Sequence, residues 1–222
     1  MRNVIKRVMV VLMALCILLG MTPVSTQAAT KTITYKAYKT TYHNNLIILL
    51  KNNTKKVVGV ETTVKFYDEA GKEVAKTTEQ VSAIYGNGNY VQYIYPPLSE
   101  DYTEISYSKY KVSVKAIKAE PYGFDTTKLA LKAGSYNKAK KGIEVKITNN
   151  GKKKCYTTYY ALFFKDKKLV ADIIYGSDLI KPKGTDKNYV LITDFDGTMF
   201  KYDSVKFVIN DATEYDPFQE GY

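Results

Sequence analysis

The stretch VVGVETTVKFYDEAGKEV, residues Val57–Val74, decides the fold of this chain. Every second position carries an apolar or β-branched residue, which is the period of a strand with one buried face. These positions are Val58, Val60, Thr62, Val64 and Phe66. The polar segment Asp68–Gly71 then forms a turn signal ahead of a second β-rich run. The stretch therefore predicts a β-hairpin.

A second stretch of the same kind lies about one domain further along the chain. It is Lys154–Val170, KCYTTYYALFFKDKKLV, in which Phe163 follows Phe66 by 97 positions. The pairs Asn52-Asn53 and Asn149-Asn150 are separated by the same 97 positions. Two matches at one offset predict a duplicated domain.

The remaining segments of the two halves can be matched in the same order. We expect four pairs of equivalent strands: Thr32–Ala37 with Lys128–Ala133, Leu46–Asn53 with Ile143–Asn150, Tyr90–Tyr93 with Tyr189–Ile192, and Tyr102–Tyr107 with Tyr202–Phe207. Short β-rich runs divided by Gly, Asn and Asp turns, without helical periodicity, are typical of antiparallel sandwiches. The sequence predicts an all-β protein of two tandem immunoglobulin-like antiparallel β-sandwich domains, with about seven strands each.

Residues 1–28 have the pattern of an N-terminal signal peptide. Basic residues precede the uncharged run Val8–Leu19, and small residues follow at Ala28 and Ala29. The run is shorter than the roughly 20 residues that a membrane span needs. We expect cleavage near Ala28 and secretion, with retention as an N-terminal anchor as the alternative. The expected domains are then 29–119 and 127–222, joined by a linker at 120–126.

The positive charge of the chain comes almost entirely from lysine. Cleavage of the signal would remove Arg2, Lys6 and Arg7, so the net charge would fall from +11 to +8 and no arginine would remain. Because arginine supplies the planar fork that reads phosphates and guanine edges, we expect no nucleic-acid partner. Lysines along strands are usually solvated and protect sheet edges. Attraction to an anionic cell-wall polymer or membrane surface is the alternative.

The hairpin also carries a family resemblance. Val64–Asp68, followed by Glu69–Val74 and preceded by an Asn-bearing strand end, resembles the FxLYD-type extracellular domain of bacterial envelope proteins. The resemblance implies an immunoglobulin-like sandwich without catalytic residues. It is weaker in the second half, where Phe164-Lys165-Asp166 stands in for Tyr67-Asp68.

The two halves differ in the residues expected on their outer faces. The first half has Gly59, Glu61, Thr63 and Lys65 where the second has Tyr156, Thr158, Tyr160 and Leu162, followed by Phe164. Conversely, Ile47 and Leu49 stand where the second half has Glu144 and Lys146. A solvent face that becomes apolar needs a cover. The candidate partner-contact patch comprises Tyr156, Tyr160, Leu162, Phe164, Ile47 and Leu49. It packs on loops or the neighbouring domain, or it binds a partner or a second copy.

One segment resembles a catalytic motif. In YVLITDFDGTMF, residues 189–200, the spacing of Asp194, Asp196 and Gly197-Thr198 is similar to the first motif of the haloacid dehalogenase superfamily. That resemblance implies a Mg²⁺-dependent phosphohydrolase with Asp194 as nucleophile and Asp196 as acid/base. Only 24 residues follow Thr198, too few for the rest of such a fold. We therefore expect a hairpin turn, with a weak Ca²⁺ site as a further alternative.

The other reactive side chains are isolated. His43 is the single histidine, and Cys155 is the single cysteine after the signal. A thiol-protease pair would need both residues to meet, whereas a small buried apolar role suits Cys155 better. We therefore expect no catalytic residues, no metal and no cofactor.

These observations together favour one functional class. We expect a secreted, non-enzymatic binding or adhesion module at the envelope of a Gram-positive-like bacterium, with no membrane span after signal cleavage. The expected partner is a cell-wall polymer, a glycan or a protein at the cell surface. The alternatives are a basic module that adsorbs to anionic wall polymer and, more remotely, the phosphohydrolase.

Overall fold

A computed structural model describes residues 32–40, 45–121, 123–193 and 198–214 of the chain. The first half contributes six strands: β1 (Ile33–Lys39), β2 (Leu46–Asn52), β3 (Val58–Tyr67), β4 (Glu73–Ile84), β5 (Asn89–Ile94) and β6 (Lys109–Ile117). The second half contributes six more: β7 (Leu129–Asn137), β8 (Gly142–Asn149), β9 (Tyr156–Lys165), β10 (Lys168–Gly176), β11 (Thr185–Leu191) and β12 (Ser204–Thr213). All pairings between these strands are antiparallel.

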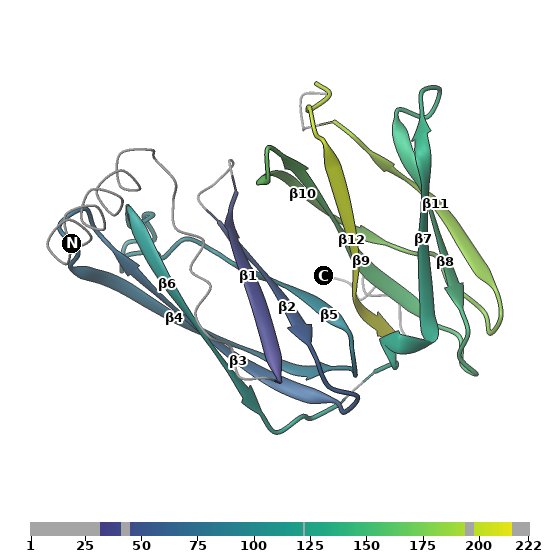
Figure 1. The fold of residues 1–222 in the computed structure, drawn as a ribbon, viewed down its shortest axis with the longest axis horizontal. Coiled ribbons are helices and arrows are strands. Elements are labelled where there is room, and N and C mark those ends of the chain that lie inside the picture. The colour runs from purple at the N-terminus through teal and green to yellow at the C-terminus, as the bar shows by residue number, and fades with distance from the viewer. Residues whose placement is uncertain (1–31, 41–44, 122, 194–197, 215–222) are drawn as a thin grey trace, which may run out of the picture.

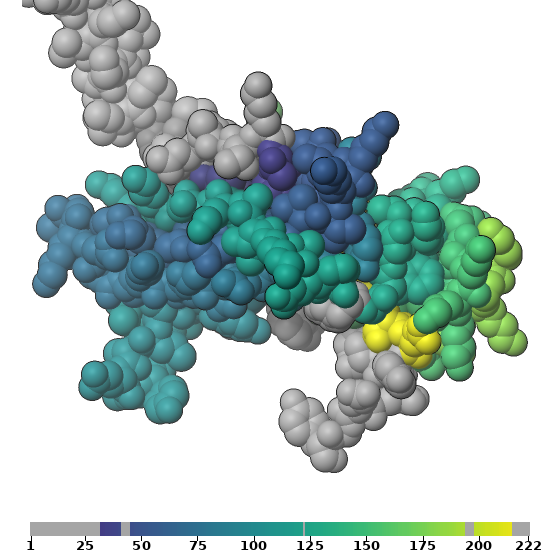
Figure 2. Space-filling view, turned by 90° about the horizontal axis from the view of Figure 1, so that it is seen from below, coloured from purple at the N-terminus to yellow at the C-terminus, as the bar shows by residue number. Residues whose placement is uncertain are grey.

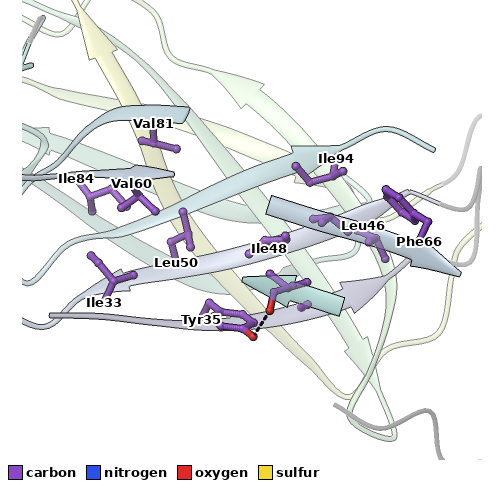
Figure 3. Close-up of a cluster of buried hydrophobic side chains, with 13 residues drawn as sticks. Ile33, Tyr35, Leu46, Ile48, Leu50, Val60, Phe66, Val81, Ile84 and Ile94 are labelled. Carbon is purple, nitrogen blue, oxygen red and sulfur yellow. Dashed lines mark hydrogen bonds between the residues drawn. The ribbon is translucent and has the colours of Figure 1, made fainter. Parts of the chain in front are cut away.

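Each half is a sandwich of two three-stranded sheets (Figure 1). In the first half, β1-β2-β5 packs on β4-β3-β6, and residues such as Leu50, Val60 and Phe66 fill the space between them (Figure 3). In the second half, β7-β8-β11 packs on β10-β9-β12 in the same way, around Tyr159 and Phe163. The all-β, antiparallel sandwich fold that the sequence predicts is therefore confirmed.

The strand order corresponds to that of immunoglobulin domains, but with fewer strands than expected. In immunoglobulin lettering the two sheets of each half are A-B-E and C′-C-F. The expectation of about seven strands per half is wrong for the described residues, which hold six in each. No described strand pairs with the outer edge of β6, where strand G would lie. Instead, the Tyr35 hydroxyl of β1 donates a hydrogen bond to the Val112 carbonyl of β6, at 2.9 Å (Figure 3).

The hairpin that decides the fold is formed by β3 and β4, as predicted. Val64 pairs with Thr77 and Phe66 with Ala75, so the alternating residues face the core. At the turn, the Asp68 carboxylate accepts a hydrogen bond from the Lys72 amide at 2.8 Å. Gly71 has a φ of 85°, in the left-handed region that glycine enters without steric cost.

A buried asparagine closes the end of the second strand in both halves. The Asn52 amide donates to the carbonyls of Lys56 at 2.7 Å and Ile84 at 2.8 Å. Asn149 does the same to Lys153 at 2.8 Å and Ile180 at 3.0 Å. Both side chains are fully buried, and their oxygens accept from the backbone two residues on. The two asparagines, 97 residues apart, thus make equivalent hydrogen bonds in the two halves.

Two of the four expected strand equivalences are wrong in register. Because β2 and β8 are equivalent, their partners show that Tyr93 corresponds to Tyr189, three residues before the expected Ile192. Likewise, Tyr107 corresponds to Tyr202 rather than to Phe207, because each ring packs edge-on against the equivalent phenylalanine, Phe66 or Phe163. Tyrosine recurs so often that a plausible match can be found at the wrong register.

The linker is attached to the second half. Phe124 is buried in the second core, and its amide donates to the Ala212 carbonyl at 3.0 Å. A Cβ at Gly151 would lie 2.5 Å from the Phe124 ring, so this position must be glycine for the ring to fit. A short 3₁₀ helix, η1 (Thr126–Lys128), follows and leads into β7.

The four sheets form a single stack. A third apolar cluster joins the outer face of β1-β2-β5 to the outer face of β10-β9-β12. The order of layers is therefore β4-β3-β6, β1-β2-β5, β10-β9-β12 and β7-β8-β11 (Figure 1). In the space-filling view the two halves abut on the face shown (Figure 2). Within the described residues, no helix is long and apolar enough to cross a membrane.

Candidate functional site

Most of the candidate partner-contact patch lies at the junction between the two halves. Ile47 and Leu49 of β2 are 0% and 6% exposed, and Leu162 of β9 is 0% exposed. They meet in the third cluster, with Tyr160 and Phe164 partly buried against it. The remaining member, Tyr156, is half-buried near the start of β9 and is not part of the cluster. The sequence left open whether this patch packs on the other domain or binds a partner. Its buried residues, Ile47, Leu49 and Leu162, pack on the other domain.

The junction is fixed by specific contacts as well as by apolar burial. The Tyr38 and Phe164 rings lie edge to face, with centroids 5.2 Å apart. The pairing of β12 with β9 shifts between Ile209 and Asp211, so Asn210 is an extra residue that the first half lacks. A β-bulge of this kind re-aims a side chain. Here the Asn210 side-chain oxygen accepts a hydrogen bond from the Val91 amide of β5 at 2.5 Å.

Ionisable side chains border the apolar junction. Asp172 pairs with Leu162 across β10 and β9, and burial raises the pKa of its carboxyl. Lys206 pairs with Leu162 from the other side, in β12. Burial, together with the nearby charges of Lys36 and Lys51, lowers the Lys206 pKa. Burial also raises the pKa of the Tyr160 phenol to about 12, so this ring stays neutral at physiological pH.

A small polar cavity lies where the two halves meet, beside β4, β5 and β12. Its lining includes Gln80, Tyr85, Asn210 and Asp211. Burial raises the pKa of Asp211, and burial with the charges of Asp125 and Asp211 raises that of Tyr85. The cavity measures about 70 Å³, well below the roughly 300–1,000 Å³ of typical small-molecule pockets. It has room for water but not for a sugar or a cofactor.

With the apolar faces joined, the two ends of the stack are left as lysine-rich faces. On the first end face, the outer side of β4-β3-β6, Lys65 pairs directly with Lys76 on one side and Lys111 on the other. We call these three residues the first lysine row. Lys65 also forms an ion pair with Glu73 at 2.8 Å, which raises the lysine pKa.

The second end face, the outer side of β11-β8-β7, has the same arrangement. Lys146 of β8 pairs directly with Lys132 of β7 and Lys187 of β11, and these residues form the second lysine row. Glu144 accepts from Lys187 at 2.8 Å and from Lys146 at 3.1 Å. Hydrogen bonds from Lys187 and then Lys146 lower the Glu144 pKa to about 2, so this carboxylate stays ionised.

The two lysine rows are not copies of each other. Register places Leu162, Asp172 and Lys206 of the second half at the positions of the first row. It places Lys36, Leu49 and Val91 of the first half at the positions of the second row. One lysine of each row therefore recurs in the other half, as Lys206 and Lys36, whereas the other two positions of each row carry different residues there.

Like charges directly opposite each other on neighbouring strands are unfavourable. They recur on both exposed faces, where three lysines outnumber one paired carboxylate, so each row has a net positive charge that attracts anions. Sequence reasoning missed these rows because it assigned Lys65 and Lys146 only to solvent. Recognising them requires the register of three strands. The β3-β4 hairpin, whose turn aligns Lys65 with Lys76, was the one signal that could have indicated the first row.

The reactive residues named in the sequence are only partly described. Cys155 is a fully buried member of the second core, and burial raises its thiol pKa to about 11, as suits a small apolar role. His43 and the segment 194–197, which includes Asp194 and Asp196, lie outside the described residues. On either side of the segment 194–197, Thr193 and Met199 form an antiparallel bridge.

Comparisons with known proteins leave the family open. No family model and no curated protein matches this chain. Among solved structures, red sea bream transglutaminase is 11% identical with a TM-score of 0.24, covering 83% of this chain and 31% of that one. A chaperone–tip adhesin complex of CFA/I fimbriae biogenesis is 12% identical with a TM-score of 0.22, covering 81% of this chain and 94% of that one. The chain thus spans about a third of the transglutaminase, and neither likeness supports a functional argument.

Proposed function

We propose that this protein is a non-catalytic binding module that adsorbs to an anionic, phosphate-rich polymer of the cell envelope. The observation that carries the proposal is the pair of lysine rows on the two exposed end faces. Of the binding modes considered from the sequence, adsorption through lysine fits this geometry better than adhesion through the aromatic patch. The central residues of that patch are already in contact with each other at the junction.

Lysine suits this kind of ligand. Its ammonium group is a compact point charge on a flexible stem, whereas the arginine fork fixes the geometry of its partner. A flexible polymer with a phosphate in each repeat offers charge at regular intervals but no fixed geometry. Exposed lysines on a strand can follow such a chain, and neighbouring strands in a sheet are spaced about 4.8 Å apart. The secretory signal expected at residues 1–28 would deliver the module to the envelope.

The binding should be electrostatic, and salt tests this directly. The mature chain, without residues 1–28, is incubated with purified Gram-positive cell wall at about 50 mM or about 500 mM salt. The higher concentration shortens the Debye length to a few ångströms. Wall stripped of its phosphate polymer is the control. We expect retention at low salt only, and none on stripped wall. Equal binding to stripped wall, or retention at high salt, would overturn the proposal.

A further inference from the structure

Resting on the proposed function, we infer that a single molecule bridges two separate chains of the phosphate polymer. The two lysine rows occupy opposite ends of the four-layered stack, so they face away from each other (Figure 1). Each row has three lysines on three neighbouring strands and a single paired carboxylate, Glu73 in the first and Glu144 in the second, so each keeps an excess of positive charge. One polymer chain lying on the first end face leaves the second end face open to another chain.

The dimensions of the stack separate the two sites. Packed sheets lie about 10 Å apart, so three successive interfaces place the end faces roughly 30 Å from each other. That distance exceeds the Debye length of about 8 Å at physiological salt. The two rows therefore act as independent sites, and each meets a polymer without sensing the charge bound at the other.

The junction holds the two sites in opposed directions. A cluster that includes Leu49, Leu162 and Val208, all 6% exposed or less, occupies the interface between the halves. The bond from the Val91 amide to Asn210 pins the edge of β5 to the bulge in β12. Two domains on a flexible linker could turn both rows toward one polymer chain. This interface prevents that rotation, which favours bridging.

The rows also explain why the stack ends after two units. An outer β1-β2-β5 face packs on an outer β10-β9-β12 face, and such a head-to-tail contact would extend indefinitely if every unit presented both faces as apolar. Lys65 at the first end replaces Leu162, and Lys146 at the second replaces Leu49. Each end face has three directly paired lysines against one carboxylate, Glu73 or Glu144, so the charge that replaces the apolar contact is mainly positive.

Bridging is tested with beads coated in long-chain inorganic polyphosphate. Five forms of the mature chain are compared at low salt: wild type, K76Q/K111Q in the first row, K132Q/K187Q in the second row, a variant lacking both rows that combines these four substitutions, and K55Q/K56Q. K55Q/K56Q is the control: it removes two positive charges, as each single-row variant does, but both residues lie in the β2-β3 loop and belong to neither row. Turbidity reports cross-linking of the beads, sedimentation with a single population of beads reports binding, and light scattering reports whether the protein is monomeric.

We expect wild type and K55Q/K56Q to bind and to cross-link the beads. Each single-row variant should still bind, within about threefold of wild type, but lose most of the turbidity. Single-row variants that cross-link as well as wild type, or a wild type that binds without cross-linking, would overturn the bridging inference alone. If a variant lacking both rows binds as tightly as K55Q/K56Q, the proposed function fails as well. Melting curves for every variant show that its fold is retained.

Discussion

At two pairs of equivalent positions, one half carries a leucine and the other carries a lysine. These differences determine which faces of the two halves pack together. Leu49 and Lys146 are equivalent, as are Lys65 and Leu162. Each half therefore has one leucine-bearing outer face and one lysine-bearing outer face, but on different sheets. The leucine faces meet at the junction, and the lysine faces point outward. The two halves share one sandwich architecture, and a few differences on the outer faces determine both how the halves pack and which residues they expose.

The largest effect should come from reversing this exchange at the junction. Leu162→Lys places the residue of the first half at a fully buried position. Burying an ammonium there, and losing the leucine contacts, should cost at least about 3 kcal/mol of unfolding free energy and separate the halves. Small-angle scattering should show a larger radius of gyration. The matched substitution Lys65→Leu, at a partly exposed position outside the junction, should leave that radius unchanged, and an unchanged radius in Leu162→Lys would contradict the packing described.

The buried asparagines are features that the two halves share, so the same change in each should have the same effect. Asn52→Ala or Asn149→Ala leaves one buried and one part-buried carbonyl without their donor. We expect each to lower the free energy of unfolding by about 2–3 kcal/mol. Denaturant unfolding measures this, with exposed Asn53→Ala, expected below about 0.5 kcal/mol, as the control. A large difference between Asn52→Ala and Asn149→Ala would argue against structural equivalence.

A smaller effect is expected at the bulge, where the halves differ by one inserted residue. Asn210→Ala removes the acceptor of the Val91 amide. The loss should be about 1–2 kcal/mol and should be confined to the junction. Amide hydrogen exchange should become faster at Val91 but not at Val60, in the core of the first half. Unaltered exchange at Val91 would show that this bond does not hold the junction.

The smallest effect concerns pH. Burial raises the pKa of Asp172 in the folded protein above its value in the unfolded chain. The folded state then binds the proton more tightly, so stability falls as the pH rises through the window between the two values. Asp172→Asn should flatten this part of the pH profile and raise the melting temperature at pH 7 relative to wild type. Parallel melting profiles for the two proteins between about pH 4 and pH 7 would exclude this role.

The sequence predicted what depends on local pattern. Alternation in Val57–Val74 indicated the hairpin, and the spacing of Asn52 and Asn149 indicated the repeat, because both follow from burial within one unit. The contrast between Leu49 and Lys146 also indicated that a face must be covered. These inferences need only one strand at a time.

The sequence did not reveal what depends on pairing between distant strands. The match of Tyr102 with Tyr202 was five residues out, because Tyr102, which is 85% exposed, lies outside the sheet. The lysine rows need the alignment of three strands, and the role of Asn210 needs a bulge that no local signal marks. The apolar outer face of each half is covered by the other half. The sequence could not show this, because it does not reveal how the two domains pack.

Lysine footprinting in the presence of polymer tests whether the lysine rows of the end faces bind it in preference to other exposed lysines. The mature chain is acetylated with and without polyphosphate, and the modification of each lysine is read by mass spectrometry. The account predicts several-fold protection of Lys76, Lys111, Lys132 and Lys187, with Lys55 and Lys56 reacting as in the free protein. Equal protection of all six lysines, or protection of Lys55 and Lys56 alone, would contradict it.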